Sequence, residues 1–422
     1  MSDTRLEAEW LKTASLQSLL KALAGEDEEA RVVGGAVRNT LLGRSVTDID
    51  VATTTTPEES TSRAQAAGFK VVPTGFEHGT VTVVALDRAY EVTTLRRDVE
   101  TDGRHARVLF GRDWRADAQR RDFTINALYC DAGGRVFDLV GGIADIEARQ
   151  VRFIGEAAAR IQEDHLRVLR FFRFFAWYGQ GRPDAEAIRA SARFKSELKR
   201  LSAERVWAEL RKLLGAPDPS RALLWMRQTG VLTKILPESE RWGIDAIHGL
   251  CAAEADLGWE ADALLRLQAI VPPDPARMSA LATRLRLSNA ERDRLLAWAT
   301  AEPIDAEEPA ARLRGRLYFG DRPAIRDRLR LAYAAAKAKA AADPGVFGTV
   351  AALHGMLKSA ETFAPPEFPL SGDDLIRHGI PAGPALGETL NRLRRTWVDS
   401  GFVLSRDKLL EKIAADRVSG GT

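Results

Sequence analysis

The sequence predicts an α+β protein, in which a head of short strands and helices precedes an all-α region that runs to the C-terminus. Before residue 150, runs rich in β-branched residues recur, among them RVVGG (31–35), TVTVVAL (80–86) and YEVTTL (90–95). Beyond residue 155, long segments rich in Ala, Leu, Arg and Glu carry apolar residues at helical spacing. The change of pattern near residue 150 therefore separates two regions of different architecture.

The length of the chain indicates more than one unit. At 422 residues it is too long for one ordinary domain. Proline-rich breaks, such as VPPDPA at 271–276, divide the helical region further. We divide the chain into an N-terminal helical segment (1–29), the head (30–150), a helical neck (151–215) and a helical body and tail (216–422).

Composition excludes several classes of protein. The formal net charge of +2 is small, so a nucleic-acid partner would need a local basic surface. Cys130 and Cys251 stand far apart, which argues against a disulfide framework or a zinc site and favours a reducing compartment. The N-terminus lacks the apolar run of a secretory signal, and no stretch approaches the length of a membrane span. We therefore expect a cytoplasmic protein with no membrane partner, and the pattern favours no particular oligomeric state.

The segment GGAVRNTLLGRSVTDIDVAT (34–53) contains a candidate metal site. Asp48 and Asp50 belong to an apparent strand, where residues two apart point to the same face. Glu91, in another apparent strand, is the obvious third acid. Magnesium needs few protein carboxylates when substrate phosphates supply the other ligands. Taken alone, two acids in this spacing are more often a solvated surface pair.

The two glycines that open this segment suggest a binding place for phosphate. Gly34 and Gly35 follow a strand and precede a predicted helix, AVRNTLLG, so bare backbone amides and a helix N-terminus would lie near the acids. Arg38 lies one turn into the helix and adds a positive fork. A glycine pair alone would indicate only a strand-to-helix turn, but its combination with the acids is far more specific.

The segment RRDFTINAL (120–128) forms a polar cluster inside an apolar stretch. Arg120, Arg121 and Asp122 are followed by Asn126. A capped helix that begins at Asp122 or Thr124 explains the same residues without a ligand, and the two readings are compatible.

A further segment, residues 159–179, combines arginines with aromatic residues. Arg167, Arg170 and Arg173 recur every three residues behind Asp164, so on a helix they form a slowly winding stripe. Such stripes are often solvated faces. The dense aromatic residues here favour a buried helix, whose arginines need partners such as phosphates or base edges.

Five patterns within roughly residues 30–215 occur in one order: GGAVRN…DID, YEVTTLRRDVETDGRHA, RRDFTINAL, QEDHLRVLRFFRF and LSAERVWAEL. Together they resemble the class II tRNA nucleotidyltransferases, the CCA-adding enzymes, which share a polymerase-β-like head with bacterial poly(A) polymerases. The resemblance implies a nucleotidyltransferase head with a mixed β-sheet, followed by a helical neck, body and tail. It also implies addition of C, C and A to the tRNA 3′ end from CTP and ATP, without a nucleic-acid template and with release of pyrophosphate.

The resemblance also implies residue roles. Asp48 and Asp50 would bind two catalytic Mg²⁺ ions, with Glu91 as a third acid nearby. Asp164 and Arg167 would read the Watson–Crick edge of CTP or ATP, since a carboxylate accepts and a guanidinium donates hydrogen bonds. The other implied nucleotide-binding residues are Gly34, Gly35 and Arg38 at the phosphates and sugar, Arg121 beside them, Asp122, Asn126 and Glu163, with Arg170 and Arg173 in support.

One position departs from the family's usual GGxVRD, which ends here in Asn39. Asparagine keeps an acceptor but loses the charge, so we expect Arg38 to be held less firmly rather than misplaced. The stretch 96–116 resembles the flexible loop that is linked to the switch from C to A addition, and its length and mixed charge predict a mobile loop.

The helical C-terminal half would grip the acceptor and TΨC arms of tRNA through backbone shape. Basic helices at 312–339 could supply contacts or could be solvated faces. GIPAGPALG (379–387) could present amides to RNA phosphates, although we favour a plain helix–turn–helix connection. The alternative activities are an A-adding-only enzyme and a poly(A) polymerase, and a catalytically silent RNA-binding relative is the alternative from a different class.

Overall fold

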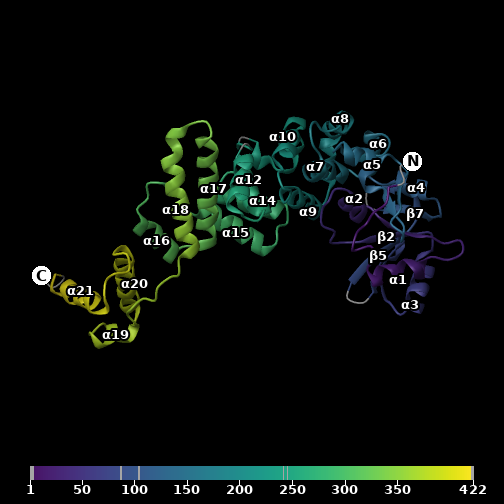
Figure 1. Ribbon diagram of the computed structural model, residues 1–422. Helices are drawn as coiled ribbons and strands as arrows, with labels where there is room; N and C mark the ends of the chain where they lie inside the picture. Colours follow the sequence, from purple (N-terminus) through teal and green to yellow (C-terminus); the bar gives the residue numbers. More distant parts are fainter. Residues whose placement is uncertain (1–3, 86–87, 103–104, 241, 245, 420–422) are drawn as a thin grey trace. The chain divides into compact units, whose positions relative to one another are not determined.

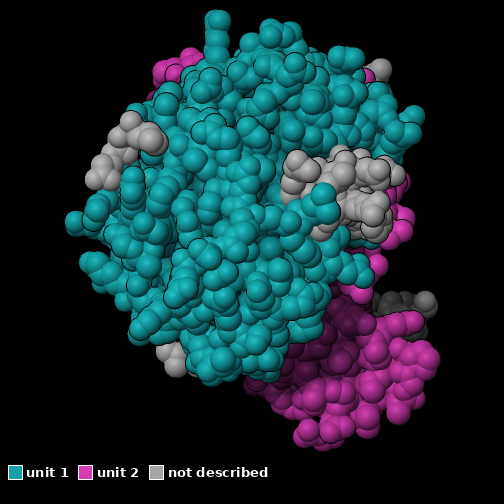
Figure 2. Space-filling model, turned by 90° about the vertical axis from the view of Figure 1, so that its right-hand side faces the viewer, with its two compact units in different colours: residues 1–237 teal, residues 238–422 magenta. Residues whose placement is uncertain are grey.

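The computed structural model describes residues 4–85, 88–102, 105–240, 242–244 and 246–419. The chain divides into two compact units, residues 1–237 and 238–422, which Figure 2 colours separately.

A mixed sheet forms the centre of unit 1, and seven strands belong to it within the described residues (Figure 1). Strands β2 and β5 run parallel, whereas the other neighbouring strands run antiparallel. The order across the sheet is β3 (Lys70–Gly75), β4 (Thr80–Ala85), β5 (Arg88–Thr94), β2 (Asp50–Thr53), β1 (Ala30–Val33), β8 (Leu128–Cys130) and β9 (Val136–Asp138). The predicted mixed sheet is confirmed.

Local sequence signals explain the elements around this sheet. Strand β4 alternates half-buried and fully buried residues, as a strand with one core-facing side does. Thr56 and Glu59 form a capping box at the start of α3 (Pro57–Ala66). Helix α1 (Ala14–Leu23) packs against α3 and the sheet and buries four leucines. Helix α2 (Gly35–Leu41) follows β1 and contacts both β1 and β8.

The predicted loop at 96–116 is wrong as secondary structure. Strands β6 (Arg96–Asp102) and β7 (His105–Phe110) pair antiparallel as a two-stranded sheet of their own, and α4 (Trp114–Gln119) begins inside the predicted loop. The two strands satisfy each other's backbone groups, and charged residues in RRDVETD interrupt the β-branched runs by which the other strands were predicted. The mixed charge of the segment is therefore the reason why the two strands were not predicted. Gly103 and Arg104 lie outside the described residues.

Helices complete unit 1 after the sheet. The longest, α7, carries the aromatic residues predicted to be buried, and Phe171, Phe172, Phe174 and Phe175 are all buried. Unit 1 continues to Pro237, beyond residue 215, where the sequence analysis ends the neck. The helices are α5 (Gly142–Glu147), α6 (Ala157–Glu163), α7 (Leu166–Tyr178), α8 (Ala185–Phe194), α9 (Ala203–Leu214), α10 (Ser220–Thr229) and α11 (Val231–Ile235).

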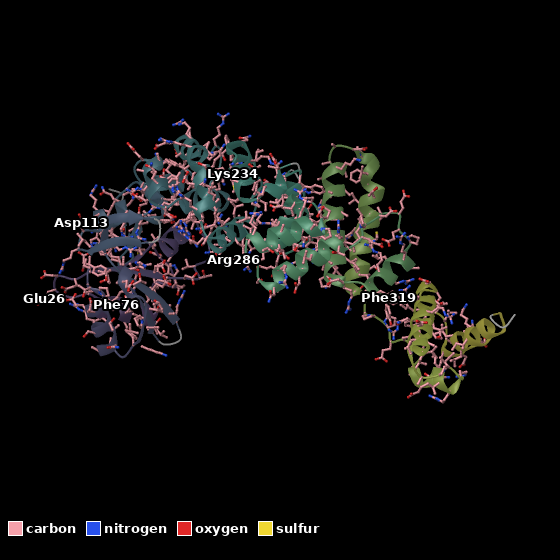
Figure 3. The ribbon with its side chains drawn as sticks, turned by 180° about the vertical axis from the view of Figure 1, so that it is seen from behind. Glu26, Phe76, Asp113, Lys234, Arg286 and Phe319 are labelled. Atoms are coloured by element: carbon pink, nitrogen blue, oxygen red, sulfur yellow. The ribbon has the colours of Figure 1, made fainter. Side chains whose placement is uncertain are left out.

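Unit 2 is helical throughout its described residues, with no strand among them, which confirms the predicted all-α region. Helices α17 and α18 lie side by side (Figure 1). Phe319, which Figure 3 labels, is the last residue of α16, and 54% of its surface is exposed. The helices are α12 (Ala246–Leu257), α13 (Ala263–Ile270), α14 (Pro275–Arg284), α15 (Asn289–Thr300), α16 (Ala310–Phe319), α17 (Arg322–Ala340), α18 (Phe347–Thr362), α19 (Gly372–Arg377), α20 (Pro384–Asp399) and α21 (Arg406–Ser419).

Residues 378–383 connect α19 to α20, and the rest of the segment 379–387 forms the first turn of α20, so the structure has a helix–turn–helix connection there. Across the described part of the chain, none of the helices combines the length and the apolar character that crossing a membrane requires.

Candidate active site

A polar recess of about 470 Å³ opens in unit 1 where α2, the start of β2, the segment 120–126 and α7 come together. We call it the recess. Its lining residues are Gly34, Gly35, Arg38, Asp50, Arg120, Arg121, Asp122, Asn126, Asp164, Leu166, Arg167, Arg170, Phe174 and Arg205.

The two glycines bring backbone to the edge of the recess. Gly34 precedes α2 with φ of 72°, a left-handed conformation that side chains other than glycine's rarely tolerate. A Cβ atom at Gly34 would lie 3.4 Å from the carbonyl oxygen of Asn126, which is closer than usual contact. At Gly35 the nearest atom to such a Cβ would be Arg38 Nη2, at 3.8 Å. The chain therefore turns tightly into α2 and leaves the start of that helix facing the recess.

Arg38 is 7% exposed, and neutral groups hold it in place. Its Nε and Nη2 donate to Asn39 Oδ1 at 3.1 and 2.9 Å, Nη2 also donates to the Tyr178 hydroxyl at 2.7 Å, and Nη1 donates to Asn126 Oδ1. Burial is the largest cause that lowers the pKa of Arg38, and the nearby positive charge of Arg173 lowers it too. Asn39 keeps the acceptor role expected of it, and Arg38 is not misplaced.

The acids lie at the start of β2, but only one of them is in the strand. The prediction that Asp48 lies in the strand is wrong: β2 begins at Asp50, where pairing to both neighbouring strands starts, and Asp48 lies in the exposed segment before it. Asp50 and Glu91 are directly paired residues of the parallel strands β2 and β5. Their side chains therefore emerge on the same face of the sheet.

The surroundings of Asp50 raise the pKa of its carboxyl group. Although Asp50 is accessible to solvent, loss of surrounding water in the recess is the largest cause that raises its pKa, followed by the negative charge of Glu91. Asp48 adds to this effect, and Arg121 opposes it. Among the described residues, no set of three His, Cys, Asp or Glu side chains is arranged to hold a metal ion alone. The uncompensated negative charge nevertheless fits a divalent cation that takes its other ligands from substrate phosphates.

Asp117 organises the arginines on one side of the recess. It is 1% exposed and accepts from Arg120, at 2.7 Å, and from Arg121 and the Tyr129 hydroxyl, at 3.1 and 2.8 Å. Burial alone would raise the pKa of Asp117, but Arg121 and Arg120 outweigh it and hold that pKa below its usual value. Both guanidinium groups are therefore fixed before any ligand binds.

Carboxylates from other elements fix the arginines of α7. Asp122 accepts from Arg170 Nε and Nη2 at 2.8 and 2.6 Å, and from Asn126 Nδ2 at 2.9 Å. Arg173 donates to Glu209 of α9 at 2.6 Å. The predicted arginine stripe is therefore a set of paired, partly buried side chains rather than a solvated face.

The junction of α6 and α7 presents Asp164 and Arg167 to the recess. Asp164 follows α6, and its Oδ1 accepts from the backbone N–H of Leu166 at 3.0 Å. Its Oδ2 accepts from Arg205 Nη2 at 2.6 Å. Arg167 pairs with Glu163 and donates to the carbonyl oxygen of Arg160 at 2.9 Å. The Asp164 carboxylate, a fixed hydrogen-bond acceptor, and the Arg167 guanidinium, a fixed donor, are thus close to each other in the sequence.

Most of the predicted site residues share the recess. Asp48, Glu91, Glu163 and Arg173 do not line it, but each interacts with a residue that does. The predicted residues that line the recess are Gly34, Gly35, Arg38, Asp50, Arg121, Asp122, Asn126, Asp164, Arg167 and Arg170.

The sequence analysis assigned no role to several residues around the recess. Arg205 lies in the quoted LSAERVWAEL pattern and Phe174 ends the quoted QEDHLRVLRFFRF pattern, so both could have been indicated, whereas Tyr178 lies outside the quoted patterns. The segment 120–128 contains a single 3₁₀ turn, Thr124–Asn126, in place of the α-helix considered as an alternative.

Two family models match the chain, one over the head and one over a later helical segment. A family model described as "Poly A polymerase head domain" matches residues 30–152, and one described as "Probable RNA and SrmB- binding site of polymerase A" matches residues 184–242. Among solved structures, the chain is similar to a Bacillus stearothermophilus CCA-adding enzyme in complex with CTP. The TM-score is 0.69 at 28% identity, covering 96% of this chain and 98% of that one. A Thermotoga maritima CCA-adding enzyme complexed with tRNA shares the fold, with a TM-score of 0.67 at 20% identity, covering 98% of this chain and 96% of that one.

Named relatives extend the match to nearly the whole chain. The chain is 40% identical over 230 residues to the CCA-adding enzyme of Geobacillus thermodenitrificans, covering 53% of this chain and 55% of that protein. It is 34% identical over 436 residues to a Mus musculus protein named "CCA tRNA nucleotidyltransferase 1, mitochondrial", covering 96% of this chain and 91% of that protein. The protein therefore belongs to the CCA tRNA nucleotidyltransferase family, which confirms the resemblance to the class II CCA-adding enzymes.

Proposed function

We propose that the recess binds CTP and ATP in turn and that the protein adds C, C and A to the 3′ end of tRNA, with release of pyrophosphate. The observation that carries this proposal is the convergence of separate motifs on one recess. Glycines at a helix start, an acid of raised proton affinity and a fixed carboxylate–guanidinium pair come from stretches up to 130 residues apart in the chain, and all of them line the recess.

The acids and glycines supply the side of the site that would handle phosphate. Asp48 and Asp50, with Glu91 nearby, would hold Mg²⁺ in a two-ion arrangement. When bound, the metal supplies charge neutralisation at the α-phosphate and a more acidic 3′-hydroxyl. The backbone at Gly34 and Gly35 would bind phosphate oxygens, and Arg38 would add a cation beside the phosphates and sugar.

Asp164 and Arg167 would recognise the base. The Asp164 carboxylate would accept from the exocyclic amine that cytosine and adenine share, and Arg167 would donate to a ring acceptor of either base. Uracil and guanine carry a carbonyl oxygen where this amine stands, which would face the carboxylate unfavourably. The pairs Asp164–Arg205 and Arg167–Glu163 support this role, because they hold both side chains in place before the nucleotide arrives.

The helices after residue 215 would bind the acceptor and TΨC arms of tRNA by recognising the shape of the RNA backbone. The head would be the catalytic part, and the neck would recognise the base. Some arginines in the basic segment 312–339 already have partners within the protein. Arg316 pairs with Glu308 at 2.9 Å, and Arg328 donates to the carbonyl oxygen of Trp298 at 2.9 Å. The remaining exposed cations are the better candidates for RNA contacts. A cytoplasmic location is part of the proposal and rests on the wide separation of Cys130 and Cys251 in the sequence, which favours a reducing compartment.

The test uses tRNA that lacks its 3′ residues, Mg²⁺ and each nucleotide alone or together. Addition of two C residues with CTP, and of CCA with CTP and ATP, is the expected result. If the protein adds a single A residue, and only to tRNA that already ends in CC, it is an A-adding enzyme. A long A tail would indicate a poly(A) polymerase. Absence of extension under every condition, with tRNA binding retained, would indicate a catalytically silent RNA-binding relative.

A further inference from the structure

Arg38 faces the recess as a buried cation whose hydrogen-bond acceptors are all neutral. Within the part of the chain that the structure describes, no carboxylate forms an ion pair with it, and its acceptors are two amide oxygens and a phenol. A buried cation without an ion pair is costly unless a ligand compensates it. Its hydrogen bonds therefore all go to neutral groups, and the negative charge of Asp122, which raises the pKa of Arg38, acts on it without an ion pair, so the guanidinium remains available to an anion.

Tyr178 is the neighbour of Arg38 that comes from α7. It is the last residue of α7, the helix that also carries Arg167 and Arg170. The Arg38 guanidinium lies over the Tyr178 ring, 4.1 Å from its centre, and also donates to its hydroxyl at 2.7 Å. Arg44, which follows α2, lies 5.0 Å from the centre of the same ring. Tyr178 thus contacts Arg38 through both its face and its hydroxyl.

We propose that Tyr178 is a positioning residue for the nucleotide, because it holds Arg38 against the recess and thereby aligns α2, on the phosphate side, with α7, on the base side. The inference rests on the proposed function of the recess. It also explains how the uncharged Asn39 is tolerated: the phenol supplies part of the fixation that a carboxylate at position 39 would supply, and it does so without neutralising Arg38.

This role predicts a specific kinetic signature. The phosphates and sugar next to Arg38 are common to all nucleotides, so loss of the tether weakens CTP and ATP binding equally. Base choice stays unchanged, because Asp164 and Arg167 are fixed by Arg205 and Glu163. A general displacement of α7 would instead disturb base choice and stability together.

The experiment begins with Tyr178→Phe, which removes the hydroxyl and keeps the ring. The KM for CTP and for ATP is expected to rise about tenfold, with kcat within about twofold and discrimination against UTP and GTP unchanged. Tyr90→Phe is the matched control, since the Tyr90 hydroxyl is hydrogen-bonded to Ser15 at 2.8 Å and Tyr90 does not line the recess. The unfolding midpoint is measured for both variants.

A second arm repeats Tyr178→Phe in an Asn39→Asp background. A carboxylate at position 39 would hold Arg38 by itself, so the loss caused by Tyr178→Phe should shrink from about tenfold to about twofold. Binding of inorganic tripolyphosphate, measured by calorimetry, should show the same pattern without any tRNA.

The two proposals fail in different ways. Unchanged tripolyphosphate and CTP affinity in Tyr178→Phe, or an equal loss in both backgrounds, would overturn the tether while tRNA extension by the natural protein still stands. A natural protein that extends no tRNA, but binds tripolyphosphate in a Tyr178-dependent way, would overturn the proposed function and leave the tether in place.

Discussion

Buried charge is treated differently in the recess of unit 1 and in the core of unit 2. In unit 2, Arg266 and Glu254 are 2% and 4% exposed, and they pair directly, with Arg266 Nη2 at 2.6 Å from Glu254 Oε2. In the recess, Arg38 has only neutral acceptors, and the acid nearest to Asp50 in the sheet is another acid, Glu91. The core of unit 2 neutralises this pair internally, whereas the recess, beside its own ion pairs, leaves Arg38 and Asp50 without an ion pair among the described residues.

The difference teaches which buried charges serve folding and which serve a ligand. Removing a charge from water costs several kcal/mol, and a close ion pair recovers much of that cost within the protein. An uncompensated charge recovers it only when a ligand arrives. The recess is therefore a place where the protein trades stability for binding, and the core of unit 2 is not. Mutations in the two regions should consequently separate loss of activity from loss of stability.

The largest expected effect is on catalysis, from Asp50→Ala. Transfer should fall about 10³-fold or more, because the metal that Asp50 would hold supplies several kcal/mol to the reaction. Binding of tRNA should stay within a few-fold of its natural value, since the grip on tRNA lies elsewhere. Single-turnover extension and a gel-shift titration check the two quantities separately. A comparable loss of tRNA binding would show that this division of labour is mistaken.

The next effect is on stability, from Glu254→Ala in the core of unit 2. Leaving Arg266 buried without its partner should lower the free energy of unfolding by about 3–5 kcal/mol. Urea denaturation followed by circular dichroism measures it. Arg292→Ala is the control, because its pair with Asp293 is exposed and should contribute less than about 1 kcal/mol. If Glu254→Ala proved as mild as the control, the contrast between the two regions would be lost.

A third effect is on nucleotide choice, from Asp164→Ala or Arg167→Ala. Discrimination against UTP and GTP should fall by about 10- to 100-fold, a larger change than the fall in the rate of C addition. Competition between nucleotides in the extension assay measures it, with Arg200→Ala as the control, since Arg200 is an exposed arginine that does not line the recess. Unchanged selectivity would refute the role of these two residues in base reading.

The smallest effect is a gain of stability from Asp50→Asn, measured on the protein in the absence of metal and nucleotide. Because the pKa of Asp50 is raised in the folded protein, the protonated carboxyl is favoured by folding, and the ionised form above that pKa destabilises the protein. Asparagine removes this penalty, so Tm should rise by at most a few degrees at pH 8 in a chelator. The gain should disappear as the pH falls through the folded pKa of Asp50. Glu77→Gln, at an exposed acid of the head, should show neither change.

The sequence predicted best those features that local patterns determine. The tight turn at Gly34, the helix after it and the acid Asp50 at the start of a strand all follow from residues close together in the chain. Asp164 and Arg167 were implied by a motif of similarly short range. Gly34, Asp50, Asp164 and Arg167 all line the recess.

Features that depend on partners far away in the sequence were not predicted. Tyr178 reaches Arg38 across 140 residues, and Arg205 reaches Asp164 across 41. The strand pair β6–β7 was not predicted because charged residues interrupt its β-branched residues, and Asp48 lies outside β2 because strand pairing begins only at Asp50. Such contacts depend on how the elements pack, and no spacing rule encodes them.

The central claim is that the recess, and no other cavity of unit 1, is the nucleotide site. The most direct measurement is a crystal structure of the protein with CTP and Mg²⁺. We predict phosphates beside Gly35 and Arg38, metal at Asp48 and Asp50, and the cytosine edge at Asp164 and Arg167. Nucleotide bound instead in the larger cavity of about 630 Å³ lined by Gln119, Arg152 and Arg160 would contradict the account.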